Sequence, residues 1–145
     1  MLLPMQEQNS LSMRGAHSGR PVILSVDDDL TVLFTRFKLL SASGYGVISA
    51  SDGAQALQLF AEHPVDLVLL DYALPEMDGG MVADAMKAHR PNVPIIMISG
   101  IEVPQQVLAL VNDYVRKGEG PETLLNSIQK ALNGSGPRAS QAAAS

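Results

Sequence analysis

The chain has no cysteine and no concentrated block of basic residues. The lack of cysteine excludes disulfide bonds, thiolate metal sites and a cysteine nucleophile. Ten Lys and Arg residues are scattered among fifteen Asp and Glu residues, and the formal net charge is −5. Proteins that bind nucleic acid by neutralising its phosphates need a concentrated positive surface, so we expect no nucleic-acid partner.

Long hydrophobic runs are also missing. No apolar stretch approaches the roughly 20 residues that a membrane-spanning helix needs. The first nineteen residues lack the basic start and the apolar run of a signal peptide. We therefore expect a cytoplasmic protein without a membrane partner. Hydrophobic residues make up 46% of the chain and charged residues 17%, which is typical of a globular domain with a sizeable core.

Composition divides the 145 residues into three parts. Residues 1–20 are polar and without periodicity, and residues 134–145 are mostly small and polar. Both patterns are typical of flexible segments. The sequence therefore predicts a flexible leader, one folded domain at 21–133 and a flexible tail, with no internal repeat.

Within the predicted domain, strand and helix patterns alternate five times. Short apolar runs predict strands at 22–26, 45–50, 65–70, 94–98 and 113–116. Apolar residues at helical spacing predict a helix after each strand, with a short fourth helix at 103–110 and a last helix beginning at Pro121. In the first helix these residues are Leu30, Leu33, Phe34, Phe37 and Leu40. The order predicts an α/β fold, a doubly wound five-stranded parallel sheet of the flavodoxin-like type with a shortened fourth helix.

Carboxylates follow two of these apolar runs. The run at 65–70 is the most apolar, so we expect a central strand there, and it leads directly into Asp71. The run at 22–26 leads into three aspartates at 27–29, one of which is expected to cap the next helix. In parallel sheets, ligands bind beyond the carboxyl ends of the strands. The sequence therefore predicts an acidic pocket that can hold a hard divalent cation and offer a carboxylate oxygen to a phosphoryl group.

Ser99 and Lys117 follow the fourth and fifth strand runs, at the same predicted edge. Each has an ordinary explanation by itself, as a turn serine and a solvated lysine. Together they supply what a phosphorylated carboxylate needs, because a hydroxyl can bond one phosphoryl oxygen and an ammonium can pair with another. Gly100 beside the serine leaves room for that group.

In this order, these motifs resemble the receiver domain of two-component response regulators. The resemblance covers most of 21–133 and includes the Leu-Pro-x-Met-Asp-Gly segment at 74–79. That family has an acidic pair after the first strand, an aspartate ending the third, Ser or Thr ending the fourth, and an aromatic residue and then a lysine on the fifth. The matching residues here are Asp27, Asp28, Asp71, Ser99, Tyr114 and Lys117.

By this resemblance, Asp71 is the phosphoacceptor. It would take a phosphoryl group from a histidine kinase or a histidine phosphotransfer protein and become an aspartyl phosphate. Mg²⁺ is the implied cofactor, held by Asp28, Asp71 and the backbone carbonyl of Ala73, with Asp27 acting through water. Lys117 is implied to bind the phosphoryl oxygens together with Ser99.

The resemblance also implies how the signal leaves the domain. Ser99 and Tyr114 would form a switch in which the tyrosine swings inward with the serine. The chain is not expected to be an enzyme acting on other substrates, although it would catalyse its own Mg²⁺-dependent phosphorylation and dephosphorylation. Because only a short tail follows the last helix, we expect a stand-alone receiver that signals by contact with an unknown downstream protein.

Two departures from the family pattern keep alternatives open. Gly118 follows the lysine where the family usually has proline, and the segment between Ser99 and Lys117 is short. The short segment trims the fourth helix and keeps a phosphorylation-independent interaction module with a degenerate receiver fold open as an alternative. A hydrolase of the haloacid-dehalogenase type is disfavoured, since it needs a second aspartate at the position of Ala73.

Overall fold

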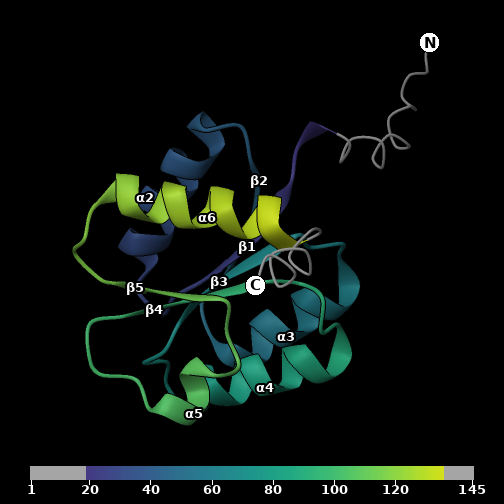
Figure 1. The fold of residues 1–145 in the computed structure, drawn as a ribbon, viewed down its shortest axis with the longest axis vertical. Helices are drawn as coiled ribbons and strands as arrows, with labels where there is room; N and C mark the ends of the chain where they lie inside the picture. Colours follow the sequence, from purple (N-terminus) through teal and green to yellow (C-terminus); the bar gives the residue numbers. More distant parts are fainter. Residues whose placement is uncertain (1–18, 136–145) are drawn as a thin grey trace, which may run out of the picture.

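The computed structural model describes residues 19–135, which form a parallel sheet with a helix after each strand (Figure 1). The strands are β1 (Val22–Val26), β2 (Gly46–Ala50), β3 (Leu67–Asp71), β4 (Ile95–Ser99) and β5 (Asp113–Arg116). The helices are α2 (Leu30–Ala42), α3 (Gly53–Glu62), α4 (Gly79–His89), α5 (Gln105–Leu108) and α6 (Pro121–Ser135). The predicted alternation of strands and helices is confirmed.

The strand order in the sheet is β2-β1-β3-β4-β5, and all four pairings are parallel. The chain moves from β1 to β2 on one side, then crosses to β3 on the other. This reversal creates a crevice beyond the carboxyl ends of β1 and β3, where α/β proteins bind ligands. Every residue of β3 is buried, while β2 at the edge is largely half-buried, which agrees with their apolar content.

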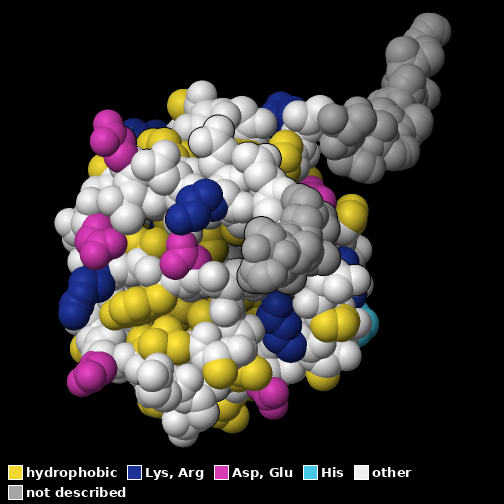
Figure 2. Space-filling model, in the orientation of Figure 1, with side chains coloured by type: hydrophobic (Ala, Val, Ile, Leu, Met, Phe, Trp, Pro, Cys, Tyr) yellow, Lys and Arg dark blue, Asp and Glu magenta, His cyan; other side chains and the backbone are white. Residues whose placement is uncertain are grey.

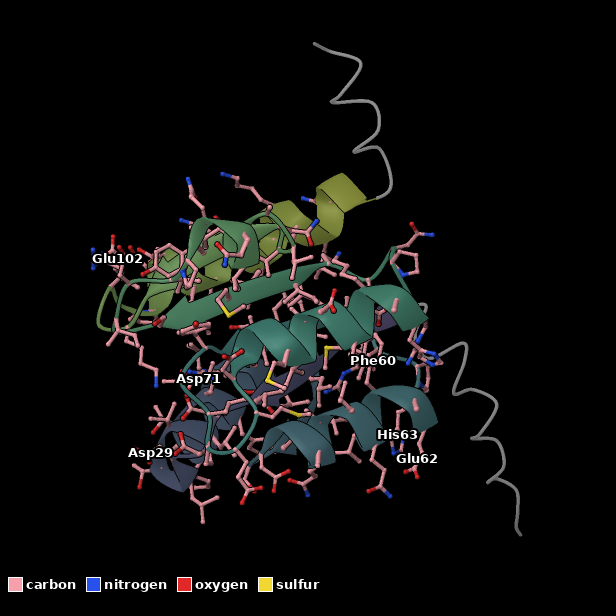
Figure 3. The ribbon with its side chains drawn as sticks, turned by 90° about the horizontal axis from the view of Figure 1, so that it is seen from below. Asp29, Phe60, Glu62, His63, Asp71 and Glu102 are labelled. Carbon is pink, nitrogen blue, oxygen red and sulfur yellow. The ribbon has the colours of Figure 1, made fainter. Side chains whose placement is uncertain are left out.

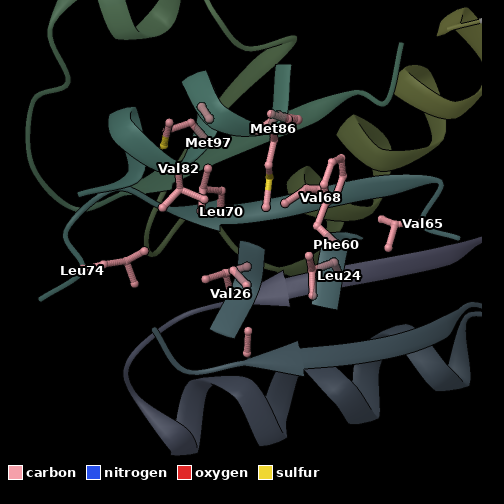
Figure 4. Packing of buried hydrophobic residues seen from close by; sticks show 14 of the residues in the cluster. Leu24, Val26, Phe60, Val65, Val68, Leu70, Leu74, Val82, Met86 and Met97 are labelled. Carbon is pink, nitrogen blue, oxygen red and sulfur yellow. The ribbon is translucent and has the colours of Figure 1, made fainter. Parts of the chain in front are cut away.

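Helices cover both faces of the sheet (Figure 1). The α2 and α6 helices lie on one face, and α3, α4 and α5 lie on the other. Alternate residues of β3 point to opposite faces. Val68 and Leu70 join the cluster that includes Phe60 of α3 and Met86 of α4 (Figure 4). The other face is a second cluster, in which Leu67, Leu69, Ile96 and Ile98 pack with Leu40, Leu124 and Ile128.

Three helices begin at an aspartate N-cap. The Asp29 carboxylate accepts hydrogen bonds from the backbone N–H groups of the first turn of α2. Asp52 and Asp78 do the same for α3 and α4. Satisfying these otherwise unpaired N–H groups stabilises each helix start by about 1 kcal/mol. The expectation that one of the aspartates at 27–29 caps a helix is confirmed, and Asp29 is that residue.

The buried face of α2 differs from its apolar pattern. Of the five apolar residues at helical spacing, only Leu33 and Leu40 are buried, whereas Leu30, Phe34 and Phe37 are exposed. The third buried residue of this helix is Arg36. The spacing therefore predicted the helix correctly but did not identify all the residues that face the sheet.

The predicted boundaries shift slightly at the functional edge. Asp71 and Ser99 are the last residues of β3 and β4, because they still pair in the ladder with Ile98 and Arg116. The fourth helix is short, as expected, and none of the four residues of α5 is buried. At the end of the described residues, α6 includes positions 134 and 135, which the sequence had assigned to the tail.

The rest of the predicted leader and tail lies outside the described residues, except for Gly19 and Arg20. Across residues 19–135, the structure has no helix with the length and apolar content required to cross a bilayer.

Candidate functional site

The carboxyl edge of the sheet brings together residues that the sequence places far apart. Asp27 follows β1, Asp71 ends β3 and Lys117 follows β5. Lys117 Nζ lies 3.2 Å from Asp27 Oδ2 and 3.4 Å from Asp71 Oδ1. Carboxylate oxygens of Asp27, Asp28 and Asp71 all lie within 4.8 Å of one another. The predicted acidic pocket is therefore present, and Figure 3 shows Asp71 and Asp29 at the end of the sheet opposite to His63.

The three carboxylates differ in burial and in partners. Asp27 is 0% exposed and Asp71 is 1% exposed, whereas Asp28 faces solvent. Within residues 19–135, the buried Asp71 Oδ1 accepts no hydrogen bond, although Lys117 forms an ion pair with it. Buried polar atoms are normally hydrogen-bonded, so a buried carboxylate oxygen with an ion pair but no hydrogen bond indicates a binding position. A buried oxygen beside two more carboxylates is a donor set that suits a hard cation such as Mg²⁺.

Burial and charge shift the pKa values of the two central groups. The pKa of Asp71 is raised, by burial first and then by the negative charge of Asp27, while Lys117 opposes the change. Burial alone would lower the pKa of Lys117, but the attraction of Asp71 and Asp27 outweighs it and raises that pKa. Lys117 is therefore held as an ammonium, and ionised Asp71 is stabilised by any cation that enters the pocket.

Asp27 has protein partners on both of its oxygens. Oδ1 accepts a hydrogen bond from the backbone N–H of Asp29 at 3.0 Å. Oδ2 contacts Lys117 and also Arg36 Nη2, the latter at 3.4 Å. The carboxylate is thus held in place from several sides, which leaves it less free than Asp28 or Asp71 to bind a metal directly.

Arg36 was not predicted as a site residue. Its guanidinium donates through Nη1 to Ser25 Oγ at 3.3 Å and through Nη2 to Asp27. Burial lowers the pKa of this guanidinium, against the attraction of Asp27 and Asp71. The available signal was its spacing, three residues after Leu33 and four before Leu40, which places a charged residue on the buried face of a helix.

The predicted switch residues lie in a neighbouring network. Ser99 Oγ donates to the carbonyl oxygen of Ile101 at 2.7 Å and accepts from the Ile101 N–H at 3.0 Å. The Tyr114 hydroxyl donates to the same carbonyl oxygen at 3.5 Å. Ser99 and Tyr114 therefore share one acceptor in the loop after β4. Their described hydrogen bonds link them to this loop, whereas Lys117 contacts Asp71 directly.

The loop after Asp71 is tightly packed at its far end. A Cβ at Gly79 would lie 2.7 Å from the Asp71 carbonyl oxygen and 2.8 Å from Tyr72 Cα. Only glycine allows the start of α4, capped by Asp78, to lie so close to the end of β3. Ala73, the predicted carbonyl ligand, is exposed within this loop. The Asp-Gly pair that ends the Leu-Pro-x-Met-Asp-Gly segment is thus explained by the helix cap and by this close packing.

Gly118, the residue after Lys117, has a backbone conformation that proline cannot adopt. Gly118 has a φ of +93°, in the left-handed region that favours glycine. Proline is restricted to a φ near −65°, so it does not fit this conformation. Even so, Lys117 is held by its two carboxylate contacts, and the substitution does not remove it from the pocket.

The family model for the response regulator receiver domain matches residues 23–129. The chain belongs to this family. A probable transcriptional regulator, ycf27 of Cyanidium caldarium, is 35% identical over 135 residues, which cover 88% of this chain and 51% of the relative. The receiver domain thus spans about half the length of the curated relatives that it matches.

Solved structures of receiver domains have the same fold. The CheY-like receiver protein of Methanospirillum hungatei is 26% identical with a TM-score of 0.77, and the match covers 82% of this chain and 98% of the other. The response regulator TrrA of Thermotoga maritima, solved in complex with Mg²⁺–BeF, is 26% identical with a TM-score of 0.73. That match covers 77% of this chain and 99% of TrrA.

Proposed function

We propose that this receiver domain accepts a phosphoryl group on Asp71 from a histidine kinase or a histidine phosphotransfer protein. The supporting observation is Asp71 Oδ1, a buried oxygen with no hydrogen-bond donor, beside Lys117 and close to two more carboxylates. A nucleophile needs a lone pair that the protein has not fully engaged. Asp27 has partners on both oxygens, whereas the described contacts of the buried Asp71 carboxylate are limited to the ion pair with Lys117.

The residues at this edge fit a Mg²⁺ ion. Asp28, Asp71 and the Ala73 carbonyl would hold it, with Asp27 acting through water because its own oxygens already have protein partners. When bound, Mg²⁺ neutralises charge on the transferring phosphoryl group. The Mg²⁺–BeF complex of TrrA supports this assignment.

In the transfer step, a carboxylate oxygen of Asp71 attacks the phosphorus of a phosphohistidine. The P–N bond breaks and its electron pair stays with the imidazole, which leaves an aspartyl phosphate on this chain. Lys117, already 3.4 Å from Asp71, then pairs with a phosphoryl oxygen. Transfer of this kind depends mainly on positioning and electrostatics, which these side chains supply.

The signal would leave through the loop after β4. When Ser99 turns its hydroxyl to the phosphoryl group, the Ile101 carbonyl loses one of its two hydroxyl donors and is left to Tyr114 alone. Both residues then adopt a new arrangement beside β5, which a downstream protein reads by contact. The chain would act in the cytoplasm and catalyse only its own phosphorylation and dephosphorylation.

Mass spectrometry tests the acceptor directly. Incubation with acetyl phosphate and Mg²⁺ should add one phosphoryl group to the wild type and none to Asp71→Asn. Asp84→Asn removes the same charge from an exposed site on α4 and should label normally. Equal labelling of wild type and Asp71→Asn would refute the assignment.

The interaction-module alternative has one observation in its favour. A cavity of about 860 Å³ lies beside α5 and β5, and its lining includes Val103, Leu108 and Tyr114 together with Glu102 and Arg116. Figure 2 shows hydrophobic side chains gathered between α6 and α5. This alternative predicts that no phosphoryl group is accepted, so the labelling experiment separates the two functions.

A further inference from the structure

Arg36 is a buried cation on the sheet-facing side of α2. It is 8% exposed and lies between Leu33 and Leu40, the other buried residues of this helix. Arginine is almost never fully buried unless its charge is paired. A buried guanidinium at this position therefore needs a negatively charged partner, and Asp27 of the acidic pocket is that partner.

The guanidinium is tied to the end of β1 at two points. Nη1 lies 3.3 Å from Ser25 Oγ, and Nη2 lies 3.4 Å from Asp27 Oδ2. Ser25 and Asp27 are both 0% exposed. Arg36 thus holds the first aspartate of the acidic pair from the buried side and limits the directions in which its carboxylate can turn.

Asp27 Oδ2 has a second cation, Lys117 Nζ at 3.2 Å. Lys117 is 37% exposed and also contacts Asp71, whereas Arg36 is buried and contacts Ser25 of β1 and Asp27 directly after it. The pocket therefore combines three carboxylates with two cations, for a formal net charge of −1. Without Arg36 the same groups would carry −2.

We propose that Arg36 is a positioning residue of the acidic pocket, which fixes Asp27 and weakens Mg²⁺ binding by balancing one negative charge. The inference rests on the Mg²⁺ site of the proposed function. It also explains how Lys117 can leave Asp27 for a phosphoryl oxygen. Because Arg36 stays behind, that movement does not leave a buried carboxylate unpaired, which would be strongly unfavourable.

Mg²⁺ titration calorimetry on the 145-residue wild-type chain and its variants tests the proposal. Arg36→Gln removes the charge but keeps an N–H donor, and should bind Mg²⁺ roughly tenfold more tightly, since a nearby charge acts strongly in a partly buried site. Lys38→Gln removes the same charge from the exposed side of α2, where Lys38 lies over Phe34. It should stay within about twofold of the wild type because solvent and salt screen exposed charges.

Arg36→Lys separates charge from geometry. It keeps the positive charge and loses the forked pair of donors, so its Mg²⁺ dissociation constant should remain within about threefold of the wild type. If Arg36→Gln does not fold, Arg36→Met removes the same charge with an apolar side chain and is titrated in its place.

The outcomes distinguish the inference from the proposed function. Tighter Mg²⁺ binding in the neutral Arg36 variant, but not in Lys38→Gln, supports the inference. Unchanged or weaker binding in the neutral variant overturns it, because a purely structural arginine would change stability and not the affinity of the folded protein. A wild-type chain that does not bind Mg²⁺ overturns both.

Discussion

Gly79→Ala should distort the proposed phosphoacceptor site without changing any of its side chains. Gly79 is the first residue of α4, directly after the Asp78 cap. An added Cβ would lie 2.7 Å from the Asp71 carbonyl oxygen, 2.8 Å from Tyr72 Cα and 3.2 Å from Met97 Sδ. The two closest atoms belong to the backbone, so the start of α4 or the end of β3 must move.

The magnitude follows from two opposing effects. Overpacking of a tight site typically costs about 1–3 kcal/mol, and backbone contacts place this site toward the upper end. Replacing glycine by alanine in a helix returns at most about 1 kcal/mol. We therefore expect Gly79→Ala to lower the free energy of unfolding by about 1–2 kcal/mol and to slow labelling by acetyl phosphate, because Asp71 shifts with its backbone.

Gly53→Ala is the matched control. Gly53 is also the first residue of a helix after an aspartate cap, and its Cβ would lie 2.7 Å from Met77 Sδ and 2.9 Å from Val82 Cγ2. These are side-chain atoms, and methionine adjusts easily. Urea unfolding followed by circular dichroism, together with the labelling rate, should show a smaller stability loss and near-normal labelling. If Gly79→Ala were as stable and as reactive as the wild type, the close approach of Gly79 to the end of β3 would be contradicted.

Three further predictions concern the charges of the pocket. Mg²⁺ at about 100 times its dissociation constant should stabilise the fold by ~2.7 kcal/mol, several degrees in a thermal melt. Asp28→Ala should abolish most of that gain, and an equal gain in this variant would contradict the metal assignment. The pKa of Asp71 is raised in the folded protein, so protonated Asp71 favours folding. This contribution is fully present below the ordinary pKa of 3.8 and is lost as pH rises through the raised pKa. Asp71→Asn should therefore gain stability relative to the wild type between mildly acidic and neutral pH, and urea unfolding at several pH values checks this; a constant difference would contradict it. Lys117→Ala should bind Mg²⁺ at least as tightly as the wild type, because it removes a nearby positive charge, yet lose any phosphorylation-dependent change in its NMR spectrum. Much weaker Mg²⁺ binding in that variant would count against the role given to Lys117.

The sequence by itself determined the sheet and the edge at which the site lies. The apolar run before Asp71 predicted a central strand, because a strand covered on both faces must be apolar throughout. In the structure, every residue of this strand is buried. Alternation of strands and helices implies parallel strands, whose carboxyl ends share one edge. Asp27, Asp71 and Lys117 were therefore predicted to meet, and the structure confirms that they do.

Only the tertiary structure decided which side chains pair at that edge. The contact of Arg36 with Asp27 depends on how α2 is rotated against the sheet. The apolar pattern of this helix predicted that Phe34 and Phe37 face the sheet, but both are exposed. The shared acceptor of Ser99 and Tyr114 depends in the same way on the path of the loop after β4. Periodicity assigns a residue to a helix or a strand. Which side chains become partners depends on how the packed elements are placed relative to one another, and a linear pattern does not contain that information.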